Sequence, residues 1–315
     1  MIRRLDFVSA AAALACVPSL AAAQTPLVKL RMASAPDEDI AAALLAQSNG
    51  AFRKAGLDVD IQRGNSGSAV AAAVVGGSLE MGKSSMMSLI NAHIKGLPLV
   101  LIASAALYNS DAPVVGMIVA KNSPLKTGKD FNGKILSVSS LNDQFQIAMS
   151  AWIDARGGDS ATVKYLELPA SAAPAAVATG RVDGATVANP ILAEAVVTGG
   201  CRIIGRPFDA IAKQFTFAAY FTSLDFAAKN KDVVARFRKA IVESSTYGNA
   251  HPADTVDVVA KFSGIDAKTI AGMTRTTLGT SLDSKLIEPL IAAALRYKAI
   301  PHGFDPREMI EAAGA

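Results

Sequence analysis

The segment LDVDIQRGNSGSAVAAAVVGGSLEMG, residues 57–82, holds the pattern that decides the fold. Residues 57–62 predict a strand, the Ala- and Val-rich residues 68–76 predict a short helix, and residues 79–82 predict a second strand. A polar Gly/Ser loop separates the first strand from the helix. Alternation of short apolar strands with helices is typical of a parallel sheet that is covered on both faces.

The same alternation continues on both sides of this segment. Upstream, residues 28–33 predict a strand, and residues 39–55 predict a helix that ends at Gly56. Downstream, residues 86–94 predict a helix and residues 97–105 a strongly apolar strand. We therefore expect right-handed crossovers between successive strands.

A second α/β series follows a long apolar strand at residues 113–120. Its strands and helices are predicted, in alternating order, at residues 135–138, 142–156, 163–166, 172–179, 184–187, 191–197 and 202–205. The apolar run 215–222 then predicts a return from this series. Strand signals stop after it, and the remaining segments have helical spacing: 232–247, 255–262, 267–273 and 284–298. We expect these helices to bury their apolar faces against the first lobe.

This order of elements predicts an α/β protein with two lobes. The first lobe is discontinuous, with residues 24–116 plus 220–315, and the second lobe, residues 117–219, is inserted into it. Two strand-like crossings form the hinge and permit closure. A small ligand is expected in the cleft between the lobes, because such crevices are favoured pocket sites.

The first residues predict export. Arg3 and Arg4 form a basic region, residues 7–17 are a short apolar run, and Ala21–Ala23 supplies small residues. This pattern predicts a signal peptide cleaved after Ala23, and hence a periplasmic protein. The apolar run is too short to span a bilayer, which needs about 20 residues. Lipidation at Cys16 is the alternative interpretation.

Composition excludes several classes of partner and reaction. The net charge of +4 comes without a cluster of Lys and Arg, which argues against a nucleic-acid partner. His93, His251 and His302 have no metal-ligand spacing, so we expect neither a metal nor a cofactor. Gly64–Ser68 resembles the G-x-S-x-G nucleophile elbow but ends in serine. After signal cleavage Cys201 is the remaining cysteine, expected to be a buried apolar residue. No catalytic constellation emerges, and we predict that the protein is not an enzyme.

Polar turns at strand ends are better candidates for a site. Residues 63–68 connect a strand to the start of a helix, where unpaired backbone N–H groups and the helix dipole favour a ligand. Ser66 and Gly67 are therefore predicted ligand-binding residues. The alternative is that Ser66 or Ser68 only caps the helix.

Lys83, Ser84 and Ser85 are predicted to form a second such turn, after the strand at residues 79–82. If the Lys83 ammonium faces the cleft, it favours an anionic ligand. The alternative is a solvated lysine at the rim of the cleft.

The second lobe supplies matching turns. Residues 139–143 lie between a strand and a helix, with Asn142 as a binding candidate and Asp143 suited to the positive helix end. Phe145 either stacks on a planar ligand or joins the core. Asn189 follows a strand and is predicted to present its amide to the cleft.

Four short motifs, in this order and spacing, resemble the nitrate/sulfonate/taurine-type substrate-binding proteins of ABC transporters, which include relatives that bind thiamine-precursor pyrimidines. The motifs are FRKAGL at 52–57, GSLEMG at 77–82, SPL at 123–125 with DFNGK at 130–134, and GRVDGA at 180–185. The resemblance implies a type II periplasmic binding protein fold, an ABC permease partner at the inner membrane, and a pocket that draws on Ser34, Ser66, Gly67, Ser84, Ser85, Asn142, Phe145 and Asn189.

Two departures separate this chain from the family pattern. Ala188 and Asn189 stand where family members often carry an aromatic or acidic residue, and no cysteine-rich segment like that of the synthase relatives is present. The sequence therefore predicts a monomeric solute-binding protein that captures a small polar, anionic organic ligand. A cofactor-independent enzyme on the same fold and a sensor partner that delivers ligand to a membrane receptor are the alternatives.

Overall fold

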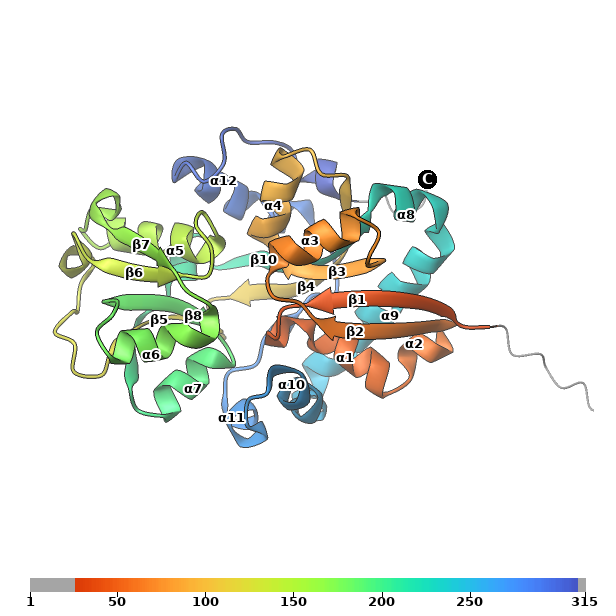
Figure 1. Cartoon of the computed structure of the whole chain (residues 1–315), viewed down its shortest axis with the longest axis horizontal. Coiled ribbons are helices and arrows are strands. Elements are labelled where there is room, and N and C mark those ends of the chain that lie inside the picture. The colour runs from red at the N-terminus through yellow and green to blue at the C-terminus, as the bar shows by residue number, and fades with distance from the viewer. Residues whose placement is uncertain (1–25, 311–315) are drawn as a thin grey trace, which may run out of the picture.

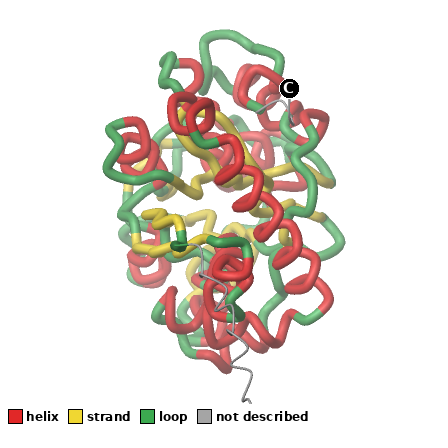
Figure 2. Tube along the Cα trace, turned by 90° about the vertical axis from the view of Figure 1, so that its right-hand side faces the viewer, coloured by secondary structure: helices red, strands yellow, loops and turns green. Residues whose placement is uncertain are grey.

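The computed structural model describes residues 26–310. The predicted signal peptide, its cleavage site after Ala23 and the alternative lipidation site Cys16 lie outside the described residues. Two β-sheets lie side by side, and helices surround the strands (Figures 1 and 2). No helix within the described range is both long enough and apolar enough to span a bilayer.

The first sheet has the strand order β11-β4-β10-β3-β1-β2. In chain order its strands are β1 (Val28–Ser34), β2 (Leu57–Arg63), β3 (Met81–Ser85), β4 (Leu99–Asn109), β10 (Gln214–Ser223) and β11 (Thr277–Leu278). β1 pairs in parallel with β2 and β3, whereas β10 is antiparallel to both β3 and β4. The sheet is therefore mixed rather than purely parallel, because the returning strand β10 enters its centre.

The second sheet has the order β7-β6-β8-β5-β9. Its strands are β5 (Val115–Ala120), β6 (Ile135–Val138), β7 (Lys164–Glu167), β8 (Gly184–Ala188) and β9 (Cys201–Gly205). β6 is parallel to β7 and β8, and β5 is antiparallel to β8 and β9. Both sheets thus combine a parallel part with an antiparallel strand that continues the connection between them, β10 in the first sheet and β5 in the second. The first sheet also has the short edge strand β11 antiparallel to β4.

Most of the helices agree closely with the predicted segments. The helix predicted at residues 39–55 is divided near Gly50, whose backbone is left-handed with φ of 78°, and the helix at residues 224–229 was not predicted. In chain order the helices are α1 (Ala41–Ser48), α2 (Ala51–Lys54), α3 (Gly67–Val75), α4 (Met86–Ile94), α5 (Gln144–Asp154), α6 (Ala173–Ala178), α7 (Ile191–Val197), α8 (Leu224–Lys229), α9 (Lys231–Ala250), α10 (Val256–Ser263), α11 (Ala267–Gly272) and α12 (Glu288–Arg296). Helices α4 and α7 begin and end where their apolar spacing predicts.

Two segments connect the sheets: residues 110–114 between β4 and β5, and residues 206–213 between β9 and β10. The boundaries predicted at 116/117 and 219/220 fall inside β5 and β10. Strand β5 is apolar throughout, and β10 is mostly apolar and buried from residue 215 to residue 222, so no change in composition marks the crossing. In the structure the chain crosses from one sheet to the other at residues 110–114 and 206–213.

Aromatic rings pack tightly where the two connections pass. The Phe208 ring lies 5.2 Å from both Tyr108 and Phe215, measured between ring centroids. Phe145 of α5 stacks on Phe208 at 5.7 Å, with 17° between the ring planes. Side chains from both sheets therefore share one apolar cluster at the connection.

The C-terminal helices follow the prediction in part. The long helix α9 packs against α1 and β4 of the first sheet, as expected. In contrast, α11 also contacts α7, and α12 also contacts α5, which both cover the second sheet. These helices therefore pack against the first lobe, as expected, and two of them also contact helices of the second lobe.

Candidate functional site

A cavity of about 800 Å³ lies between the two sheets. Its wall combines residues that follow β1, β2 and β3 in the first sheet with residues that follow β6, β7 and β8 in the second. The carboxyl ends of parallel strands are where open α/β sheets place ligands. The volume falls within the range of small-molecule sites, about 300–1,000 Å³.

Most of the predicted site residues lie in this wall. The lining includes Ser66, Gly67, Lys83, Ser84, Ser85, Phe145 and Asn189. Their role in binding stays a prediction, since a position in the wall does not by itself make a contact with a ligand.

Ser34 and Asn142 lie outside the wall. The Ser34 side chain is buried, and its hydroxyl donates to the carbonyl of the next residue, Ala35, at 2.7 Å. Asn142 adopts a left-handed backbone with φ of 59°, and its backbone N–H donates to Gln146 Oε1 at 2.7 Å. The lining of the cavity does not include either residue, and their role in binding stays a prediction.

Two predicted serines cap helices. Ser66 Oγ accepts the backbone N–H of Ala69 at 3.2 Å at the start of α3. Ser85 Oγ accepts the backbone N–H of Ser88 at 3.3 Å at the start of α4, and donates to Ser88 Oγ at 2.9 Å. Ser66 therefore caps α3 and Ser85 caps α4, and their predicted role in ligand binding is compatible with capping.

Ser84 differs from its neighbours. Its hydroxyl is buried and has no hydrogen-bond partner in the described part of the chain. Gly67 packs directly against it, and a Cβ atom at position 67 would lie 2.0 Å from Ser84 Oγ. The glycine is therefore required by this close approach of α3 to β3, in addition to any approach of a ligand.

Lys83 is not in a turn. β3 extends to Ser85, and Lys83 pairs with Tyr220 of the neighbouring strand β10. Its side chain is 2% exposed, forms an ion pair with Asp39, and lies 3.6 Å from Asp37 Oδ2. The interpretation as a solvated rim lysine is wrong, because the side chain is buried. Lys83 does line the cavity, but two carboxylates pair with its ammonium inside the wall, so its role in holding an anionic ligand stays a prediction.

Burial and the neighbouring charges shift the pKa values of Lys83 and Asp39 in opposite directions. Burial alone would lower the pKa of Lys83, but Asp39 and Asp37 together raise that pKa above its ordinary value. Burial raises the pKa of Asp39 to about 6, against the attraction of Lys83. Lys83 and Asp39 are consequently both charged at neutral pH.

Glu38 was missed by the sequence analysis. Its Oε1 accepts the Arg275 Nε–H at 2.5 Å, and its Oε2 accepts the Thr276 backbone N–H at 3.0 Å and hydroxyl at 2.8 Å. These bonds join the mouth of the cavity to the segment before β11. No local signal reveals the contact, because its partners lie more than two hundred positions away in the chain.

In the second sheet, Asp143 caps α5. Its Oδ1 accepts the backbone N–H of Gln146 at 2.8 Å, and its Oδ2 accepts the Ser139 hydroxyl at 2.6 Å and the Ser140 backbone N–H at 3.2 Å. Burial raises the pKa of Asp143, and these hydrogen bonds oppose the rise. Phe145, one residue into the helix, both joins the aromatic cluster through Phe208 and lines the cavity.

Asn189 connects the second sheet to the C-terminal part of the chain. Its side-chain Nδ2 donates to the carbonyl oxygen of Thr274 at 2.8 Å, and its backbone N–H donates to Val114 at 2.9 Å. The amide nitrogen predicted to meet a ligand is thus already bonded across the cavity wall.

The wall also holds buried oxygens that the sequence analysis missed. Ser137 Oγ, Gln144 Oε1 and Thr186 Oγ1, like Ser84 Oγ, have no hydrogen-bond partner among the described residues. A buried polar group without a partner costs about 1–3 kcal/mol. Such groups are candidates for direct ligand contacts, because a ligand that bonds to them removes that cost.

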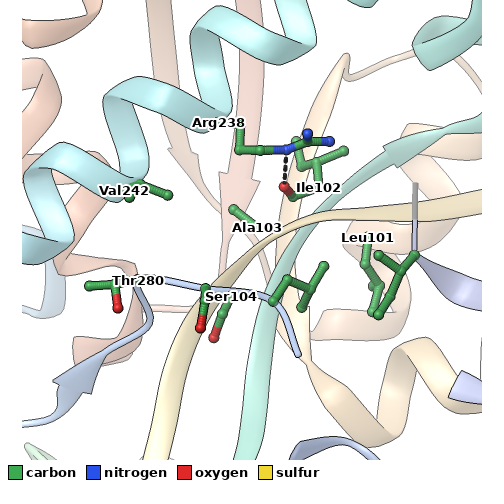
Figure 3. A pocket seen from close by; sticks show the side chains of 10 residues that line it. Leu101, Ile102, Ala103, Ser104, Arg238, Val242 and Thr280 are labelled. Atoms are coloured by element: carbon green, nitrogen blue, oxygen red, sulfur yellow. Dashed lines mark hydrogen bonds between the residues drawn. The ribbon is translucent and has the colours of Figure 1, made fainter. Parts of the chain in front are cut away.

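A second, smaller cavity of about 190 Å³ lies between β4 and α9 (Figure 3). Leu101, Ile102 and Ala103 line it with apolar side chains, and Arg238 Nε donates to the Ile102 carbonyl oxygen at 2.8 Å. Its volume is below the usual range for small-molecule sites. The cavity between the sheets is therefore the stronger candidate.

Groups suited to metal or thiol chemistry do not gather in the described structure. Within residues 26–310, no three His, Cys, Asp or Glu side chains are placed to hold a metal ion. Cys201 is buried at the start of β9, as expected, and burial raises the pKa of its thiol.

Known proteins share this architecture. The taurine-binding periplasmic protein of Escherichia coli (strain K12) is 25% identical over 244 residues, which cover 74% of this chain and 73% of that protein. The crystal structure of the periplasmic aliphatic sulphonate binding protein SsuA from Escherichia coli matches with a TM-score of 0.73 at 20% identity, over 90% of this chain and 92% of that chain. The crystal structure of the desulfurization enzyme DSZB matches with a TM-score of 0.68 at 13% identity, over 91% and 97% of the two chains.

The solved structures establish the fold, which is that of the periplasmic binding proteins, and so confirm the predicted fold class. The resemblance to sulfonate- and taurine-type binding proteins is confirmed as well. Residues 37–255, more than half of the chain, match the NMT1/THI5-like family, and the protein belongs to that family.

Proposed function

We propose that this protein is a periplasmic solute-binding protein that captures a small polar organic molecule in the cleft between its sheets and delivers it to an ABC transporter. The observation that carries the proposal is the cavity of about 800 Å³, which has unpartnered buried oxygens in its wall from both sheets. Ser84 belongs to the first sheet, and Ser137 and Thr186 belong to the second. A ligand that bonds to both walls favours a closed arrangement.

Closure of the cleft would take place about the two connections at residues 110–114 and 206–213. Hinge motions are absorbed by a few residues at the ends of elements, and both connections are of this kind. A ligand can drive such a motion only through contacts that it makes more favourably in the closed form. Contacts to both sheets meet this requirement.

We propose the partner and the compartment by analogy with the relatives. A protein similar to the taurine-binding periplasmic protein is proposed to act in the periplasm, as a monomer, with a membrane permease of the ABC class as its partner. The buried position of Cys201, with its raised thiol pKa, offers no reactive cysteine at the cleft. We propose binding without chemical turnover, by analogy with the taurine-binding and sulphonate-binding relatives.

The anionic ligand predicted from Lys83 stays a prediction. Asp39 and Asp37 already balance the Lys83 charge, so the ammonium is not available to hold an anion by itself. The ligand class must be argued from the rest of the wall.

A thermal-shift screen over sulfonates, carboxylates, amines and pyrimidines tests the proposal, together with small-angle scattering of each complex. A ligand present at about 100 times its dissociation constant adds about 2.7 kcal/mol to the free energy of unfolding. The expected result is a raised melting temperature with a smaller radius of gyration and unchanged ligand chemistry. Conversion of a bound compound into a product would favour an enzyme instead.

A further inference from the structure

The wall of the cleft carries more negative than positive charge. Its ionisable residues in the described structure are five carboxylates and two lysines: Asp37, Glu38, Asp39, Asp143 and Glu167 against Lys83 and Lys95. Two of these carboxylates have basic partners, since Glu38 pairs with Arg275 and Asp39 pairs with Lys83. The other three carboxylates are Asp37, Asp143 and Glu167. Among the described residues, only Lys95, and Lys83 through its weaker pairing with Asp37, are available in the wall to balance their charge.

Two of the remaining carboxylates are open to the cleft and come from opposite sheets. Asp37 follows β1, and its side chain is 41% exposed. Glu167 ends β7 and is exposed; its Oε1 accepts the backbone N–H of Leu141 at 2.7 Å, and its Oε2 has no partner in the described chain. Closing the cleft around an anion would add negative charge to this wall, whereas a cation would compensate it.

The unpartnered oxygens of the wall favour the same class of ligand. Gln144 Oε1 is an acceptor, 2% exposed as a residue and without a partner in the described chain. The hydroxyls of Ser84 and Thr186 are likewise unpartnered and accept as readily as they donate. The carboxylate oxygens of Asp37 and Glu167 and the Oε1 of Gln144 accept hydrogen bonds and cannot donate them, so N–H donors of a ligand suit all three. An ammonium group supplies three N–H donors together with a positive charge.

We propose that the ligand of this cleft carries a protonated amino group, which lies between Asp37 and Glu167, and that an anion without such a group is a poor ligand. This inference rests on the proposed function and names its ligand class. Glu167 binds the amino group from the second sheet and Asp37 from the first, so that closure brings the two carboxylates around one cation.

The test compares four probes of similar size by calorimetry and thermal shift: taurine, which has an amine and a sulfonate; isethionate, in which a hydroxyl replaces that amine; and ethanolamine and putrescine, which carry amines without an anion. The expected result is that amine-bearing probes bind and that isethionate binds at least tenfold more weakly than taurine. Isethionate binding as tightly as taurine would overturn the inference, and so would the failure of every amine probe at high millimolar concentration.

Variants locate the amino group. Glu167→Gln keeps an acceptor for the Leu141 N–H while removing the charge, and should weaken amine binding by roughly tenfold to a hundredfold. Asp37→Asn tests the opposite wall in the same way. Glu243→Gln is the matched control, since Glu243 is exposed on α9 and does not line the cleft. The affinity of this variant for amines should equal that of the wild-type protein. If the Glu167→Gln and control proteins bound amines with equal affinity, Glu167 would not be the residue that binds the amino group.

These outcomes separate the inference from the function on which it rests. Tight binding and closure with isethionate, unaffected by Glu167→Gln, would leave a solute-binding protein with a different ligand class. Conversion of the bound amine into another compound, with the Glu167 dependence intact, would keep the ligand class and remove the binding-protein function.

Discussion

The Lys83–Asp39 ion pair lies inside the cavity wall, where both partners have lost most of their contact with water. Such a pair adds little net stability, because desolvation offsets the attraction between the charges. Removing one partner is different, since it leaves an uncompensated charge in the interior. Lys83 is therefore a structural part of the first sheet, and its effect on ligand binding acts through Asp37 and Asp39.

Replacement of Asp39 by alanine should expose this dependence. We expect Asp39→Ala to lower the free energy of unfolding by about 3–5 kcal/mol, measured by urea denaturation at neutral pH. The double replacement Asp39→Leu with Lys83→Met should recover most of the loss, because neither charge of this pair is then left buried without its partner. A cost below about 1 kcal/mol for Asp39→Ala would show that Asp37 alone balances Lys83.

The Asp39 pKa also predicts a pH dependence. The folded protein holds the Asp39 proton up to about pH 6, whereas the ordinary value is 3.8. The native state therefore binds more protons between these values, so this contribution to stability is complete below the lower value and is lost as the pH rises through the upper one. Asp39→Asn should show a flatter dependence of unfolding free energy on pH from about 4 to 6. Parallel curves for the two proteins would contradict the raised pKa.

Gly67 is a residue whose replacement tests packing at the cleft. In Gly67→Ala the new methyl group meets Ser84 Oγ, and we expect a loss of about 1–3 kcal/mol in unfolding free energy and weaker ligand binding. Gly272→Ala is the control, since no atom lies within 4 Å of a Cβ at that position. An unaltered melting temperature and affinity for Gly67→Ala would mean that α3 moves away from β3 without cost.

The end of strand β3 holds both a buried charge, Lys83, and the residue that caps helix α4, Ser85. The strand was predicted to end at residue 82, but it continues to Ser85, where the chain turns directly into α4. Ser84 and Ser85 are neighbours with opposite surroundings: one hydroxyl is unpartnered beside the cavity, and the other caps the helix. Replacing Ser84 or Ser85 by alanine should therefore affect stability and ligand affinity differently.

We expect Ser85→Ala to cost about 0.5–2 kcal/mol of stability, because the first turn of α4 loses its capping acceptor. Ser84→Ala should leave the stability of the ligand-free protein unchanged or higher, since its hydroxyl has no partner to lose, while ligand affinity falls. Denaturation of both variants, with and without ligand, measures the contrast. A larger stability loss for Ser84→Ala than for Ser85→Ala would reverse these assignments.

At the scale of the whole molecule, the two sheets share an aromatic cluster, and helices α11 and α12 connect to the second sheet. The Phe208 ring contacts rings on β4, α5 and β10, so it joins parts of the chain that the connections alone would leave free. We expect Phe208→Ala to cost about 3–5 kcal/mol in unfolding free energy. Leu224→Ala, at an exposed position, is the control for loss of apolar volume. Independent unfolding of the two sheets in wild-type protein would contradict a shared cluster.

Local sequence determined the elements of this protein. Helices α4 and α7 and strand β6 begin and end where their apolar spacing predicts, because hydrophobic periodicity and turn residues act within a few positions. The two α/β series and their short motifs also sufficed to predict the fold class. In the cleft, the same local signals marked the strand ends near which Ser66, Ser84 and Asn189 lie.

Only the tertiary structure decided which side chains are buried together. β10 enters the first sheet beside β3, which encloses Lys83, and Arg275 reaches Glu38 from the far end of the chain. Ser137 and Thr186 lie in short strands among apolar neighbours, so no periodicity distinguishes them from core positions. The charge and hydrogen-bonding needs of the cleft depend on such long-range partners, because desolvation and pairing are properties of the assembled interior rather than of any segment.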